Sequence, residues 1–218
     1  MKFLGNPSSG SVAGQTFSHN SYGQYVRTRA IPTNPATTAQ GVVRARLALY
    51  AAGWRALTDN QRAAWRDLGL SMTRTDSLGQ TYSLTGEQAY VSVNSLNAAA
   101  GNAAVADAPA LVTPAALLTA TITLTAAAFS IAYTTTPLAA GTRLFTFVSP
   151  QRSAGRFFES DFRLLAVSAA AAASPADVFT AYSAKFGVPV VGNRVFLSLQ
   201  VYSGGFLSGP LYTSKVVA

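Results

Sequence analysis

The sequence predicts an α+β protein with an extended N-terminal arm or hairpin, a small helical module and a C-terminal antiparallel β-sandwich. Three observations support this prediction. Three Thr-x-x-Gln capping boxes lie between positions 36 and 108, and each precedes apolar residues at helical spacing. From position 117 onward, short alternating runs rich in Thr, Val, Phe and Tyr recur between turn signals. Residues 1–35 are rich in Gly, Ser, Asn and Pro and lack a pattern that could form a core.

The N-terminal residues 1–35 are predicted to form an arm of short extended segments. The stretch 18–23 (SHNSYG) indicates a turn between two strands. Such a segment can add strands to the sheet edge of a neighbouring subunit. A hairpin packed on its own subunit explains the pattern equally well. Arg27 and Arg29 point the same way if this segment is extended, toward an acidic partner, a nucleic-acid backbone or water.

The capping boxes begin at Thr37, Thr58 and Thr85 and predict three helices. In each box the Thr hydroxyl can accept a hydrogen bond from the Gln N–H three residues on, and the Gln side chain can reach back. The residues that share one face of each helix are Val43, Leu47, Tyr50 and Trp54 in the first, Gln61, Trp65 and Leu68 in the second, and Ala89, Val93 and Leu96 in the third. Residues 70–84 are predicted to be a loop or small hairpin with Gly79 at its turn.

Six strands are predicted in the C-terminal half, and their spacing favours a sandwich. They cover residues 118–124, 129–133, 144–148, 162–167, 195–202 and 212–217. Residues 177–186 are ambiguous, because Ser174-Pro175-Ala176-Asp177 could cap one helical turn with Pro in its first position. The predicted domains are therefore an arm over 1–35, a helical module with a linker over 36–108, and the sandwich over 109–218. The small residues of 98–116 are the linker candidate.

Composition narrows the class of protein. Charged residues make up 11% of the chain, against about 25% in an ordinary domain, which favours a surface covered by neighbours in an oligomer or lattice. The net charge is +8, but both halves carry +4, and this spread argues against specific nucleic-acid binding. The absence of Cys excludes disulfides and thiolate metal sites. The sequence shows neither a signal peptide nor an apolar run of membrane length, so we expect a protein made in a cytoplasm.

The residues needed for most catalytic chemistry are missing. His19 is the single histidine and lies in a predicted turn, a poor place for a Ser-His-Asp triad. The eight acidic residues are scattered, with Glu159 and Asp161 the closest pair. We therefore predict no catalytic, cofactor-binding or metal-binding residue and no enzyme. Because the two carboxylates of a glycan hydrolase can be far apart in sequence, that alternative stays open.

Five arginines are candidate interface residues. Arg27 and Arg29 lie in the arm, and Arg55, Arg62 and Arg66 surround the second capping box beside Trp54 and Trp65. Stacking of Arg on Trp is plausible chemistry there. These residues fit an interface hot spot, since Trp and Arg dominate such sites. A cluster within the chain that joins two helices is the alternative.

Part of the sequence resembles a known module. Arg27-Thr28-Arg29, the run Pro32-Thr33-Asn34-Pro35, and residues 54–65 (WRALTDNQRAAW) resemble an N-terminal module of uncharacterised phage and prophage proteins. The resemblance covers about residues 10–100 and implies a virion component without assigned catalytic residues. The second half is similar in general pattern to fibronectin-type or immunoglobulin-like sandwiches.

The resemblance implies a phage structural protein located in the virion. We expect a capsid decoration or cementing protein that acts by subunit–subunit contacts. Its partners would be other virion subunits, in a homo-oligomer or lattice, with no cofactor. A tail or head–tail structural protein and a carbohydrate-binding surface module are the alternatives.

Overall fold

A computed structural model of the chain describes residues 9–20, 22–31, 33–76, 79–134, 136 and 138–218. Its backbone groups into two compact units, Met1–Val43 and Arg44–Ala218. The helical residues after position 43 and the C-terminal strands thus belong to one unit. None of the helices in the described ranges is long and apolar enough to cross a membrane.

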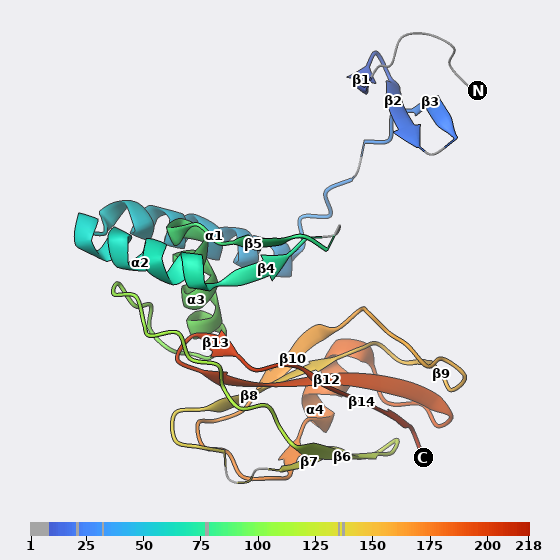
Figure 1. Cartoon of the computed structure of the whole chain (residues 1–218). Helices are drawn as coiled ribbons and strands as arrows, with labels where there is room; N and C mark the ends of the chain where they lie inside the picture. The colour runs from blue at the N-terminus through green and yellow to red at the C-terminus, as the bar shows by residue number, and fades with distance from the viewer. Residues whose placement is uncertain (1–8, 21, 32, 77–78, 135, 137) are drawn as a thin grey trace. The chain divides into compact units, whose positions relative to one another are not determined.

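The N-terminal unit contains a three-stranded antiparallel sheet in the order β1-β2-β3 (Figure 1). Its strands are β1 (Gly10–Val12), β2 (Gln15–Asn20) and β3 (Gly23–Thr28). The β2–β3 hairpin lies where the sequence predicts two strands and a turn, and the Asn20 side chain accepts a hydrogen bond of 2.9 Å from the Tyr22 N–H beside that turn. Strand β1 and its pairing with β2 extend the predicted hairpin into a sheet.

Three helices follow: α1 (Thr38–Ala56), α2 (Asp59–Ser71) and α3 (Gly86–Ala99). All three capping boxes are confirmed. In each, the Thr hydroxyl accepts a hydrogen bond of 3.3 Å from the Gln N–H, and the Gln side chain accepts one of 3.0–3.3 Å from the Thr N–H. The predicted hairpin between α2 and α3 is present as β4 (Thr73–Thr75) and β5 (Thr81–Ser83).

The helical core is built around Trp65 and Tyr90. Trp65 is 0% exposed, and its ring meets Tyr90 edge to face at 5.2 Å between centroids. The predicted inner faces of α2 and α3 are confirmed, since Leu68 and Val93 are also buried. The four residues predicted to share a face of α1 do lie on one continuous helix, but only part of that face is covered. Val43 and Leu47 are 65% and 56% exposed, whereas Tyr50 is buried.

The C-terminal part contains two antiparallel sheets and one helix, so the chain as a whole is an α+β protein. The remaining elements are β6 (Thr119–Leu124), β7 (Phe129–Thr134), β8 (Arg143–Val148), β9 (Arg152–Ser153), β10 (Arg163–Val167), β11 (Ala176–Asp177), α4 (Phe179–Phe186), β12 (Asn193–Ser203), β13 (Phe206–Leu207) and β14 (Leu211–Val216). All six predicted strands are confirmed within two residues at each end. One sheet has six strands centred on β12, and the other has the order β11-β7-β6 (Figure 1).

Strand β12 (Asn193–Ser203) organises this half through its two faces. Alternate residues such as Leu197 and Leu199 enter the main buried cluster, together with residues of β6, β7 and α4. The opposite face contributes Tyr202, whose ring stacks on Phe145 at 5.4 Å. The Tyr202 hydroxyl donates a hydrogen bond of 2.6 Å to the Asn97 side chain of α3, which joins the sheet to the helical module.

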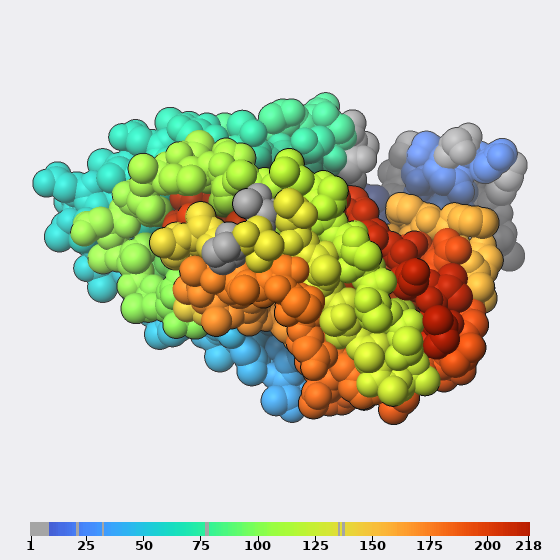
Figure 2. All heavy atoms as spheres, turned by 90° about the horizontal axis from the view of Figure 1, so that it is seen from below, coloured from blue at the N-terminus to red at the C-terminus, as the bar shows by residue number. Residues whose placement is uncertain are grey.

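The predicted linker is tied down along the helical module. Residues 100–118 form no regular element, yet their backbone is held by buried side chains. Asn94 bonds both the N–H and the carbonyl of Val105, at 2.7 and 3.1 Å. The Trp65 indole N–H donates to the Ala106 carbonyl at 2.7 Å. In Figure 2 yellow-green spheres lie against the green and teal spheres of the helical module.

The ambiguous segment before α4 is resolved differently from the predicted cap. Ala176 and Asp177 form the short strand β11 beside β7, and the helix begins at Phe179. The Asp177 side chain accepts a hydrogen bond of 2.9 Å from the Phe179 N–H. Pro175 therefore precedes a strand and does not occupy the first helical position, which was the possibility that the sequence offered.

Candidate functional site

The predicted interface arginines of the arm lie in and just after strand β3. Arg27 is the penultimate residue of β3 and lies opposite Thr16. Arg29 follows the strand, and its backbone N–H donates to the Gly14 carbonyl at 2.8 Å. Both arginines are exposed. They are therefore accessible to a partner, and their role in an interface stays a prediction.

Arg62 instead braces two helices. Its guanidinium donates to the carbonyls of Trp54 and Arg55 at 3.4 and 2.8 Å, where α1 ends, and to the Asp59 carboxylate at 3.0 Å. The last carbonyls of a helix have no partner within the helix, so these bonds cap α1 from α2. The contacts favour the alternative of a cluster within the chain for Arg62.

Arg55 and Arg66 are exposed on the helical module. A Cβ added to Gly86 would lie 2.9 Å from the Arg66 Cγ, so α2 and α3 approach closely at this pair. The predicted stacking of Arg on Trp is absent from the described residues, where the tryptophans contact Tyr90 instead. Tyr90 was not singled out from the sequence, although it lies next to Ala89 on the predicted inner face of α3.

The arm and the start of α1 have no core of their own. None of the described residues among 9–43 is buried. Phe17 and Val26 lie opposite each other on one sheet face and are only half-buried. Separately, helix α1 exposes four large apolar side chains: Val42, Val43, Leu47 and Leu49. Exposed apolar side chains of this kind are candidates for contact with another protein.

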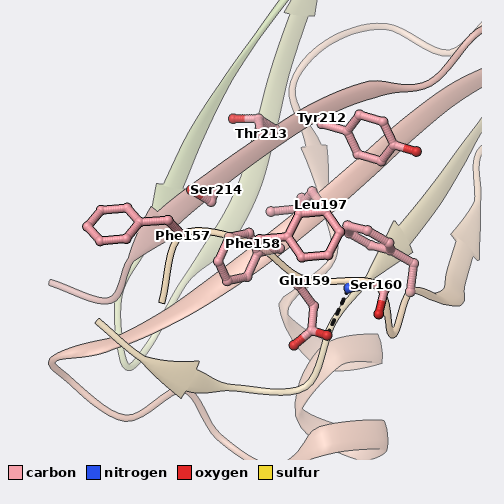
Figure 3. A pocket seen from close by; sticks show the side chains of 10 residues that line it. Phe157, Phe158, Glu159, Ser160, Leu197, Tyr212, Thr213 and Ser214 are labelled. Atoms are coloured by element: carbon pink, nitrogen blue, oxygen red, sulfur yellow. Dashed lines mark hydrogen bonds between the residues drawn. The ribbon is translucent and has the colours of Figure 1, made fainter. Parts of the chain in front are cut away.

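A second candidate surface is an open hollow of about 560 Å³ on the six-stranded sheet. The loop between β9 and β10 forms one side, and β14 forms the other. Phe157, Phe158 and Tyr212 line it with side chains that are 84%, 75% and 64% exposed. Figure 3 shows these rings on one side of the loop, while the Glu159 carboxylate lies on the opposite side.

Glu159 holds the loop in place. One carboxylate oxygen accepts backbone N–H bonds from Ser160 and Asp161 at 2.9 and 3.0 Å and faces Arg156 at 3.4 Å. The other oxygen accepts from the Arg152 guanidinium. This buried carboxylate is therefore fully used by the chain itself.

The hydrogen bonds determine the charge of this cluster. The N–H of Asp161 is the main cause that lowers the Glu159 pKa from 4.5 to about 2. Arg152 and the Ser160 N–H lower it further, and burial opposes them. Arg163 lowers the pKa of the Asp161 carboxyl in the same direction, through hydrogen bonds of 3.1 and 2.9 Å. The nearest pair of acids in the sequence is thus an ionised structural pair, and Glu159 cannot serve as a general acid near neutral pH.

The Arg194 side chain lies against one of the aromatic rings that line the hollow. The Arg194 guanidinium stacks over the Phe157 ring at 5.2 Å. Its Nε is buried without a hydrogen-bond partner in the described chain. Arg194 and Lys215 line a smaller neighbouring hollow, and Ser214 lines both. The two hollows therefore adjoin, one aromatic and one basic.

The structure places His19 on β2 with an exposed side chain. No group of three or more His, Asp or Glu side chains that could hold a metal occurs among the residues the structure describes. Comparisons with protein families, curated proteins and solved structures found no match to this chain.

Sequence reasoning missed the aromatic hollow. Phe157 and Phe158 are adjacent within 153–160 (SAGRFFES), so they break the alternation expected of a strand. Two neighbouring aromatic residues in a turn-rich, charged segment indicate a loop with exposed aromatic side chains. The basic partner Arg194 could not be placed, because it approaches from a distant strand.

Proposed function

We propose that this chain is a structural protein of a phage particle, a decoration or cementing subunit that acts by contacts with neighbouring subunits. In this proposal the two C-terminal sheets form an immunoglobulin- or fibronectin-like sandwich. The N-terminal arm and the free face of α1 are the parts that dock on other subunits.

The observation that carries the proposal is the lack of any buried residue in the described part of 9–43. Ordering the backbone costs roughly 1–2 kcal/mol per residue, and burial of apolar surface normally offsets that cost. A small sheet needs a covered apolar face to be stable. Phe17 and Val26 pair on one face of this sheet, and both are only half-buried. A neighbouring subunit would bury such a face further.

Helix α1 supports the same proposal. Val42 and Leu49 lie on one side of the helix and Val43 and Leu47 on another, and all four are exposed. A helix that is apolar on several sides is normally buried. Contacts with a second subunit would cover these side chains.

The charge of the arm and α1 predicts the charge of the partner surface. Residues 1–58 contain six Lys or Arg and no Asp or Glu, whereas residues 59–218 carry ten cations and eight acids. The arm and α1 thus hold most of the net charge of +8. We expect the docking surface of the partner subunit to be neutral or acidic.

The proposal is tested on purified particles from a host that carries the gene. Mass spectrometry should find the chain at a fixed number of copies per particle. A variant lacking residues 1–35 should fold but fail to enter particles, because the first capping box and everything after it remain. Exclusion of the full-length chain from particles, or normal incorporation of the shortened chain, would refute the proposal.

A further inference from the structure

The aromatic hollow is a preformed surface. The loop that carries Phe157 and Phe158 is fixed by the ion pairs and backbone bonds of the buried Glu159 carboxylate. The Tyr212 ring contacts Phe162 at 5.6 Å on the opposite side. Little ordering is therefore needed when a ligand binds, which favours affinity.

The lining combines rings with hydroxyl groups. Ser160, Tyr212 and Ser214 line the hollow, and no hydrogen bond within the described chain uses their side-chain hydroxyls. An aromatic face carries negative electrostatic potential and attracts partially positive C–H groups. A ligand that presents both C–H faces and hydroxyl edges matches such a lining.

The adjoining hollow supplies positive charge. Arg194 and Lys215 line it, and no acidic side chain lines it. The guanidinium of Arg194 makes its ring contact with Phe157 but has no carboxylate partner among the described ion pairs. An anionic group on a ligand would give this guanidinium the counter-charge that it lacks among the described ion pairs.

We propose that the two adjoining hollows form a binding site for an acidic saccharide. The C–H faces of the sugar rings stack on Phe158 and Tyr212, and sugar hydroxyls bond with the side chains of Ser160 and Ser214. A carboxylate on the sugar pairs with Arg194. A simple anion would leave the exposed rings unused, and an apolar peptide would leave the cation unpaired. This site is independent of the proposed role in assembly.

The test uses the full chain and three acidic probes: short oligomers of galacturonate, of mannuronate and of hyaluronan. The methyl ester of the galacturonate oligomer is the neutral counterpart with the same rings. NMR titration should shift amide signals of residues 157–160 and 212–214 with at least one acidic probe. The ester should bind more weakly, and added salt should reduce that difference.

Variants separate the two parts of the site. Phe158→Ala should weaken binding of the acidic probe at least about tenfold, because a stacked ring is lost. Arg194→Gln should remove the preference for acid over ester, and Arg194→Lys should restore part of it. Tyr82→Ala and Arg74→Gln are the controls, since both residues are exposed on the β4–β5 hairpin and line neither hollow. Thermal melts of each variant verify folding.

Any of three results would overturn the proposal. The first is that none of the three acidic probes shifts the named amides at millimolar concentration. The second is that inorganic sulfate competes at Arg194 while Phe158→Ala leaves probe binding unchanged, which would indicate a simple anion site. The third is self-association in sedimentation that Phe158→Ala abolishes and the probes do not affect, which would indicate a protein-docking surface.

Discussion

Replacing Trp65 with Ala should strongly destabilise the Arg44–Ala218 unit. The side chain is fully buried, its ring contacts Tyr90, and its indole N–H bonds the Ala106 carbonyl that closes the segment after α3. Truncation of a buried Trp costs about 3–5 kcal/mol in free energy of unfolding. That is a large share of the roughly 5–15 kcal/mol that stabilises a typical domain.

The neighbouring tryptophan provides a matched control. Trp54 is half-buried, so Trp54→Ala should cost less, about 1–2 kcal/mol. Trp65→Phe keeps a ring but loses the indole hydrogen bond, so its cost in free energy of unfolding should lie between those of Trp54→Ala and Trp65→Ala. Urea unfolding followed by far-ultraviolet circular dichroism measures all three without relying on tryptophan fluorescence. The reasoning fails if Trp65→Ala costs under about 1 kcal/mol, or if Trp54→Ala costs as much as Trp65→Ala.

Three further predictions concern the rest of this unit. Gly205→Ala should cost about 1–3 kcal/mol more than Gly204→Ala in the free energy of unfolding measured with urea. An added Cβ would lie 2.5 Å from the Val93 side chain of α3 at Gly205, and would meet nothing at Gly204. Equal costs would contradict the close packing of α3 on the sheet. Arg62→Ala should lower the free energy of unfolding by about 1–2 kcal/mol, because the end of α1 loses its cap. Arg66→Ala should leave this free energy nearly unchanged. A larger loss for Arg66→Ala than for Arg62→Ala would exclude the bracing role. The extra stability of the wild type over Glu159→Gln should be fully present above pH 4.5 and should be lost as pH falls toward 2, because the pKa of Glu159 is lowered in the folded state. Urea midpoints that differ equally at pH 6 and pH 2.5 would refute the role of the ionised Glu159 carboxylate.

Local patterns predicted the elements well, because the interactions that create them are local. Each capping box spans four residues, and each is present. The six C-terminal strands follow from alternation over five to eight residues. The exposure of Val43 and Leu47 could not be predicted, since helical spacing shows which residues share a face but not whether anything covers it.

The candidate sites depended on longer-range contacts. The role of Arg62 requires knowing that α1 ends where its guanidinium reaches. The aromatic hollow brings Phe157 and Tyr212 together across about fifty residues of sequence, and Arg194 approaches them from β12. Small residues in 98–116 predicted a linker, and the structure shows that buried Asn94 holds the backbone of this segment at Val105. A segment of mostly small residues can thus be ordered by partners that its own composition does not reveal.

The central claim is that the arm becomes ordered by contact with another subunit. Hydrogen exchange of the amides in β1, β2 and β3 measures this directly, in a verified monomer and in the assembled particle. The account predicts fast exchange of these amides in the monomer, because no described residue among 9–43 is buried, and protection in the particle. Amides of β12 should be protected in both and serve as the internal control. Strong protection of the arm in the monomer, or equally fast exchange in the particle, would contradict the claim.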